Sequence, residues 1–82
     1  KIKNKTEILY LSELKKVDKI LQEEILYNFI FDYTGHSLNY RKLRIIFELI
    51  RTKNEFWEFH VSGDWKILFS SGELRLKNTL LT

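Results

Sequence analysis

Residues 56–78 read FWEFHVSGDWKILFSSGELRLKN, and this stretch decides the fold because it predicts three short strands joined by two turns. Apolar and polar side chains alternate in Phe56–Val61 and again in Trp65–Phe69, the period of two that a half-buried strand needs. Leu74–Lys77 repeats the alternation with leucines and cations, and each turn contains a glycine. We therefore expect a small antiparallel meander.

The meander needs a cover, because so small a sheet is only marginally stable in water by itself. Its expected apolar face carries Trp57, Phe59, Trp65 or its neighbours, Leu74 and Leu76. Ile8–Leu11 is expected to add a fourth strand at the edge of the meander. The remaining apolar residues earlier in the chain are expected to form the covering layer.

A first main helix is expected over Lys19–Tyr33, with Asp18 as its N-cap and Gly35 available for a left-handed C-cap. Apolar residues fall on nearly all sides of this helix, which is typical of a buried element. We therefore expect it to be the central element of the fold. A short helical turn, Glu13–Val17 capped by Ser12, is expected to precede it.

A second main helix is expected over Tyr40–Arg51, starting from Asn39 or Ser37. Its apolar residues follow the amphipathic spacing, and charged residues occupy the other side. From Arg41 to Lys53, five cations face one carboxylate, so the chain's basic charge is concentrated here. The predicted class is α+β: two main helices and a short N-terminal helical turn on an antiparallel sheet of three to four strands.

Composition sets further bounds. The chain has 82 residues, 44% hydrophobic and 30% charged, and is expected to form one domain over residues 1–82. The absence of cysteine excludes disulfides and thiolate metal sites. No apolar run approaches membrane-spanning length, so we expect no membrane partner. The chain also lacks methionine, including at position 1, and we expect it to be a fragment of a longer protein.

Catalytic motifs are scarce in this sequence. It contains no phosphate-binding glycine loop, no nucleophile elbow and no HExxH motif. His60 and Asp64 flank a predicted turn and could form an acid–base pair, but a solvent-facing histidine and a turn aspartate are the commoner interpretation. Trp57 and Trp65 could stack on nucleobases, although aromatic residues at such strand positions are more often core.

The order of elements resembles a known family. The matching segments are Leu11–Val17, Leu21–Ile30, Leu38–Ile50, Glu58–Leu68 and Gly72–Leu76. In pattern and order they resemble the domain that follows the catalytic domain in bacterial tRNA(Ile)-lysidine synthetases. The resemblance extends from about Ile8 to Lys77, nearly the whole chain.

The resemblance implies a role in tRNA modification in the bacterial cytoplasm. These enzymes use ATP, with Mg, to adenylate the wobble cytidine of an isoleucine tRNA, and lysine then displaces AMP. Their catalytic domain carries a Ser-Gly-Gly-x-Asp-Ser loop, which this chain does not contain. The chain would therefore recognise tRNA without catalytic residues, cofactor or metal of its own, with tRNA and the sibling domains of the parent enzyme as its partners.

The candidate RNA contacts come from charge placement. Cations that neutralise phosphates fix the position of an RNA, while its sequence is recognised elsewhere. The first candidate group lies on or just after the second helix and consists of Arg41, Lys42, Arg44, Arg51 and Lys53. The second group, on the expected open side of the sheet, consists of Lys66, Arg75 and Lys77.

Two alternatives remain open. His36 and the segment His60–Trp65 look somewhat like parts of ribosome-dependent mRNA interferase toxins, but the last residues, Asn78–Thr82, lack the further histidine and aromatic residue normal in that family. A winged-helix-like DNA-binding module would use Tyr40–Arg51 as its recognition helix and the first hairpin as its wing.

Overall fold

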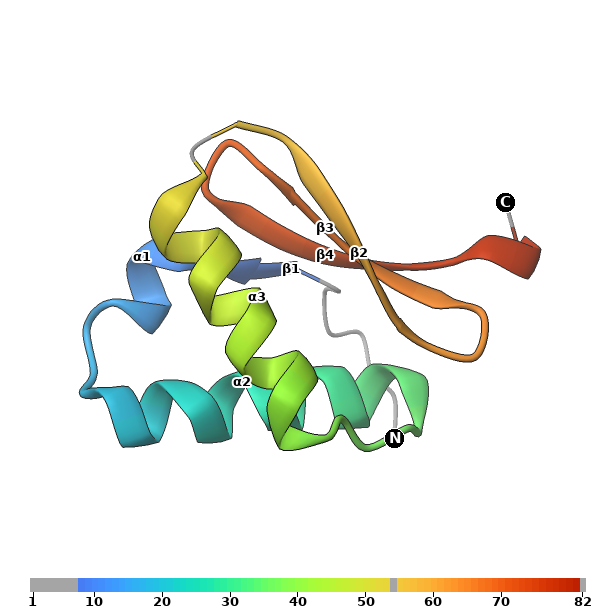
Figure 1. Ribbon diagram of the computed structural model, residues 1–82, viewed down its shortest axis with the longest axis horizontal. Helices are drawn as coiled ribbons and strands as arrows, with labels where there is room; N and C mark the ends of the chain where they lie inside the picture. Colours follow the sequence, from blue (N-terminus) through green and yellow to red (C-terminus); the bar gives the residue numbers. More distant parts are fainter. Residues whose placement is uncertain (1–7, 54, 82) are drawn as a thin grey trace.

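Three helices pack on an open antiparallel sheet of four strands, an α+β architecture as expected. The structure is a computed structural model and describes residues 8–53 and 55–81. The elements in chain order are β1 (Ile8–Tyr10), α1 (Leu11–Leu14), α2 (Lys19–Thr34), α3 (Tyr40–Thr52), β2 (Trp57–Ser62), β3 (Trp65–Ser70), β4 (Glu73–Asn78) and a final 3-10 turn (Thr79–Leu81). Helices α2 and α3 cross each other on one side of the sheet (Figure 1).

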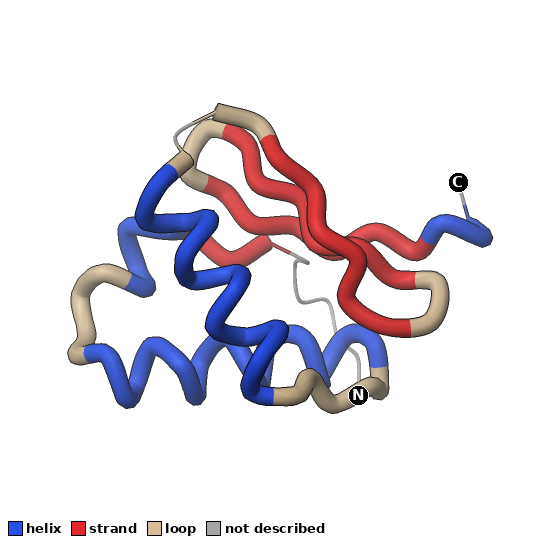
Figure 2. The backbone as a smooth tube through the Cα atoms, viewed as in Figure 1, coloured by secondary structure: helices blue, strands red, loops and turns tan. Residues whose placement is uncertain are grey.

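The sheet has the order β1-β4-β3-β2, so the predicted meander and its extra edge strand are both confirmed. Tight turns close the two hairpins of the meander (Figure 2). In the second turn both Ser71 and Gly72 have positive φ, 53° and 76°, the pair of left-handed residues that a two-residue hairpin favours. Strand β1 pairs with β4, with Leu9 opposite Leu74.

A β-bulge interrupts the first hairpin. His60 lies opposite Lys66 and Ser62 opposite Trp65, so Val61 is the additional residue in β2 without a partner on β3. The carbonyl oxygen of Val61 accepts a hydrogen bond of 2.8 Å from the Lys42 ammonium. A cation from α3 therefore satisfies a backbone acceptor at the irregular point of the ladder.

The ends of the two main helices follow the sequence signals. The Asp18 carboxylate accepts the Leu21 N–H at 3.0 Å, and the Asn39 side chain accepts the Lys42 N–H at 2.9 Å. Gly35 has φ 74° and donates its N–H to the Phe31 carbonyl, a left-handed C-cap. These residues fix where α2 ends and α3 begins, and hence which side chains of α3 point outward.

The short helix α1 differs from the prediction. It begins at Leu11 rather than Glu13, and its N-cap is Tyr10 without a side-chain cap, not Ser12. The Leu11 N–H bonds the Gly72 carbonyl at 2.9 Å, extending the pairing of the preceding strand into the first residue of the helix. The chain therefore turns into α1 directly from β1.

The core lies between the helices and one face of the sheet. Its buried residues come from α2 (Leu26, Ile30), the loop after it (Leu38), α3 (Leu43, Ile46) and the three long strands (Trp57, Val61, Ile67, Phe69, Leu74, Leu76). This agrees with the predicted apolar face, except that Phe59 and Trp65 are only half-buried, and Ile67 and Phe69 are the buried residues on β3. Trp57 stacks on Phe69, with ring centroids 5.4 Å apart.

Helix α2 is not the central buried element that its composition suggested. It lies at the outside of the helical layer (Figure 1), with Ile20 77% exposed and Phe31 46% exposed. In a two-layer fold a helix buries only the stripe that faces the other layer, here centred on Leu26 and Ile30. The apolar residues on its other side remain in solvent.

Candidate nucleic-acid interface

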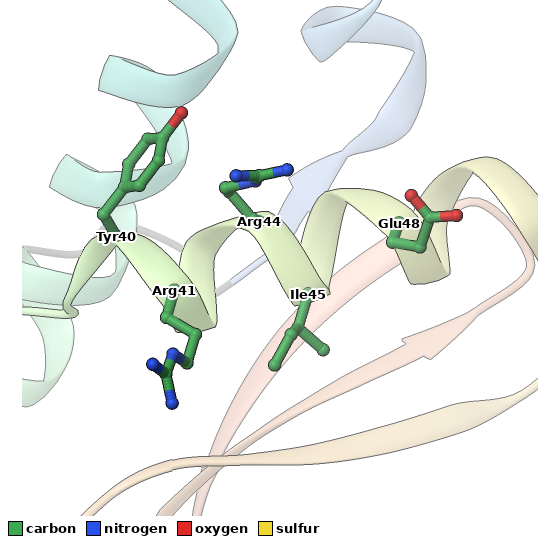
Figure 3. A pocket seen from close by; sticks show the side chains of 5 residues that line it. All are labelled: Tyr40, Arg41, Arg44, Ile45 and Glu48. Carbon is green, nitrogen blue, oxygen red and sulfur yellow. The ribbon is translucent and has the colours of Figure 1, made fainter.

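The outward side of α3 presents two of the predicted arginines to solvent. Leu43 and Ile46 are buried beneath the helix, and helical spacing places Arg41 and Arg44 on its exposed side. Figure 3 shows Arg41 and Arg44 on different flanks of the helix, with Ile45 beside Arg41. Together with Tyr40 and Glu48 they line an open hollow of about 500 Å³.

The surroundings of these two arginines leave them without an ion-pair partner in the described part of the chain. The Arg44 guanidinium lies 5.7 Å from the centroid of the Tyr40 ring, a cation–π contact that orients the group and keeps its charge. Neither Arg41 nor Arg44 forms an ion pair with a carboxylate of residues 8–53 or 55–81. Arg51, about two turns beyond Arg44, does pair with Glu48.

Two further hollows continue the first one toward α2 and α1. A hollow of about 350 Å³ shares Tyr40, Arg44 and Glu48 with the first, and it extends to Lys19 and Glu23 on α2. A hollow of about 380 Å³ then shares Lys19, Phe47 and Arg51 with the second. We call this continuous surface the cation groove. Its cations are Lys15, Lys19, Arg41, Arg44 and Arg51, and its carboxylates are Glu23 and Glu48.

Lys15 and Lys19 were not among the predicted contacts, because they precede α3 by a long stretch of sequence. Lys15 follows α1 directly, and Lys19 is the first residue of α2. Packing of α2 against α3 brings both lysines to the same groove as Arg51. The Asp18 cap could have predicted the exposure of Lys19, because the residue after an N-cap lies in the first turn of the helix.

The second predicted group lies on the face of the sheet that points away from the helices, as expected. Lys66, Arg75 and Lys77 alternate there with the buried residues Ile67, Leu74 and Leu76. The register puts Lys66 directly between His60 on β2 and Lys77 on β4. We call this surface the open sheet face.

Carboxylates neutralise most of the open sheet face. Lys66 pairs with Glu58 on the neighbouring strand at 2.7 Å, and Arg75 pairs with Glu73 on its own strand at 2.6 Å. Lys77 makes no ion pair with the described part of the chain. Since the core separates this face from the cation groove, the two predicted groups form two sites and not one.

The other two predicted contacts have different surroundings. The Lys42 ammonium donates to Val61 and so is directed at the sheet, away from the side of α3 that carries Arg41 and Arg44. Lys53 is the exposed C-cap residue of α3 and donates its backbone N–H to Leu49. We therefore do not count Lys42 as part of the cation groove.

His60 and Asp64 flank the same turn but do not form the acid–base pair considered from the sequence. His60 Nε2 lies 2.8 Å from the Gly63 carbonyl, so this nitrogen donates to backbone and not to Asp64. His36 approaches the same glycine, since a Cβ built there would lie 3.4 Å from its Nε2. Residues 8–53 and 55–81 contain no group of three or more histidines and carboxylates placed to hold a metal ion.

Comparisons of the chain with known proteins identify no relative. No protein-family model, curated protein or solved structure matches the chain. Within the described ranges, no helix has the length and apolar character needed to cross a membrane. The geometry of the cation groove and the sequence pattern are therefore the grounds on which a function is proposed.

Proposed function

We propose that this chain is a non-catalytic RNA-positioning module, namely the tRNA-recognition domain of a tRNA(Ile)-lysidine synthetase. The observation that carries the RNA part is the cation groove. Cations from α3, from the start of α2 and from the residue after α1 line contiguous hollows, and Arg41 and Arg44 are not neutralised by a described carboxylate. The groove carries five cations against the carboxylates Glu23 and Glu48, and a surface with such an excess of positive charge attracts a polyanion.

Binding would follow the physics of counterion release. Each cation that contacts a phosphate displaces counterions from the nucleic acid, so affinity falls as salt rises. Contacts of this kind set the position and orientation of the RNA without distinguishing its sequence. That is the behaviour required of a domain that seats a tRNA for a catalytic domain elsewhere in the parent protein.

The tRNA part of the proposal rests on the sequence resemblance, and the observed order of helices and strands is compatible with it. In the parent enzyme, ATP and Mg would bind the catalytic domain. The coding frame upstream of Lys1 tests this directly. A Ser-Gly-Gly-x-Asp-Ser loop after a strand is expected there, and a frame that starts within a few residues of Lys1 would remove the lysidine synthetase assignment.

The RNA part is tested by fluorescence anisotropy with a labelled tRNA(Ile) transcript between about 50 and 200 mM salt. The double variant Arg41→Gln/Arg44→Gln should bind about tenfold more weakly at the low end and reduce the slope of log K against log salt by about 2, since each phosphate contact contributes about 0.9. The matched control is Lys66→Gln/Lys77→Gln on the open sheet face, which removes the same charge.

The control should change affinity by less than about threefold, because exposed cations remote from the site act only through screened long-range fields. Equal losses in the two double variants would mean that RNA responds to total charge and not to the groove. No loss in the arginine variant would remove α3 from the RNA interface.

A further inference from the structure

We infer that the hollow of the cation groove lined from α1, α2 and α3 receives one unpaired nucleotide of the bound RNA. The inference rests on the proposed RNA-binding function and deepens it by naming the form of RNA that the groove accepts. The hollow measures about 380 Å³, within the range of small-molecule sites. Four of its eight lining residues are apolar.

The walls of this hollow suit the faces of a nucleobase. Leu11 and Leu14 contribute from α1, and Phe47 and Ile50 contribute from α3. Phe47 and Ile50 are half-buried and pack at the margin of the core, so they are held in place while one side remains accessible. A base extruded from its stack is typically held between aromatic and apolar side chains of this kind.

The rim of the hollow suits the phosphates of the same nucleotide. Lys15, Lys19 and Arg51 surround the apolar walls, and the two lysines are exposed and form no ion pair with a described carboxylate. Gln22 also lines the hollow, and one of its amide N–H groups donates to the Val17 carbonyl at 2.9 Å. That bond fixes the amide and leaves an oxygen and a second N–H for the edge of a base.

A paired base cannot enter the hollow, because stacking and pairing hold it inside the duplex. An acidic peptide would match the same charges, and it is the alternative occupant that the titration below distinguishes from RNA. This hollow has four apolar side chains in its walls, and the cations continue beyond it to Arg44 and Arg41. A single inserted base followed by a phosphate backbone fits that arrangement.

The test compares two short RNA duplexes that differ by one bulged nucleotide. The chain should bind the bulged duplex about tenfold more tightly than the fully paired one, the magnitude of one base stacked on an aromatic side chain. In Phe47→Leu this preference should shrink to less than about threefold. Phe31→Leu, at an exposed aromatic position on α2, is the matched control and should keep the full preference.

A direct readout makes the test independent of the variants. On titration with the bulged duplex, the methyl NMR signals of Leu11 and Ile50 should shift more than with the paired duplex. Equal binding of the two duplexes, or loss of both in Phe47→Leu while the variant remains folded, would overturn the inference and leave the proposed function standing. If neither duplex nor tRNA binds, the proposed function itself fails. If an acidic peptide rich in leucine shifts these methyl signals and RNA does not, the hollow is a peptide site.

Discussion

The cation groove and the open sheet face both carry several cations but present them differently. On the sheet, Lys66 and Arg75 are each held by a glutamate within 2.7 Å. In the groove, Arg41 and Arg44 have no such partner in the described ranges. Arg44 also lines the hollow between α2 and α3, while Arg41 lines the open hollow on α3 itself. The groove therefore offers a phosphate a stronger and more focused field than the flat sheet does.

The comparison shows that counting basic residues does not locate an anion site. An exposed ion pair contributes little to stability, yet it cancels the charge that a ligand would otherwise meet. What distinguishes the two surfaces is where the carboxylates fall, and this depends on strand register and on helix packing. Variants that alter one surface and spare the other can test this difference directly.

The largest expected effect is a loss of stability that distinguishes the buried side of α3 from its exposed side. The comparison of the two surfaces depends on which side of α3 faces solvent. Ile46→Ala should destabilise the fold by about 3 kcal/mol, because Ile46 is fully buried and its loss leaves a cavity. Ile45→Ala, one residue earlier and 41% exposed, should cost less than about 0.5 kcal/mol. Urea unfolding monitored by circular dichroism measures both. Similar losses would mean that α3 does not present the side described here to solvent.

An intermediate effect separates two adjacent cations of α3. Lys42→Met should lower stability by about 1 kcal/mol, since Val61 loses the donor to its carbonyl, while tRNA affinity stays within about twofold. Arg41→Met should do the reverse, leaving stability unchanged within about 0.5 kcal/mol and weakening tRNA binding about fivefold. Unfolding and anisotropy measurements on both variants check the pair. A loss of RNA affinity in Lys42→Met as large as that in Arg41→Met would place Lys42 in the interface.

The smallest expected effect comes from removing one carboxylate on each surface. Glu48→Gln frees Arg51 and should tighten tRNA binding about threefold at low salt, the effect of one charge a few ångströms from a phosphate. Glu58→Gln frees Lys66 on the open sheet face and should change affinity by less than about 1.5-fold, since screening weakens a charge that far from the groove. The opposite order would assign the RNA to the sheet.

Much of the fold could be predicted because its signals are local. Alternation in the last third of the chain gave all three long strands, and Asp18, Gly35 and Asn39 marked the helix ends through bonds to residues a few positions away. The exposure of Arg41 and Arg44 also followed from the spacing of Leu43 and Ile46 on the same helix. Within one element, periodicity alone determines which side faces the core.

The remaining features depend on contacts between elements. The prediction that α2 is the central buried element was wrong. Its composition shows that apolar residues occur all around the helix, but it does not show how many other elements pack against them. The Lys42 ammonium points to the carbonyl of the bulge residue Val61, and no residue type in the hairpin predicts that bulge. Likewise, Lys15 and Lys19 join the groove only through the packing of α1 and α2 beside α3.

Strand β1 has a consequence for how the molecule assembles. Ile8–Tyr10 pairs with Glu73–Arg75, near the other end of the described chain, whereas β2, β3 and β4 are joined by tight hairpins. Hairpins form early because little loop entropy is lost in closing them, while a contact between distant segments forms late. During synthesis on the ribosome β1 would emerge first and find its partner last. Until it does, the edge of β4 remains unpaired, and that interval is when a second nascent chain could pair there instead.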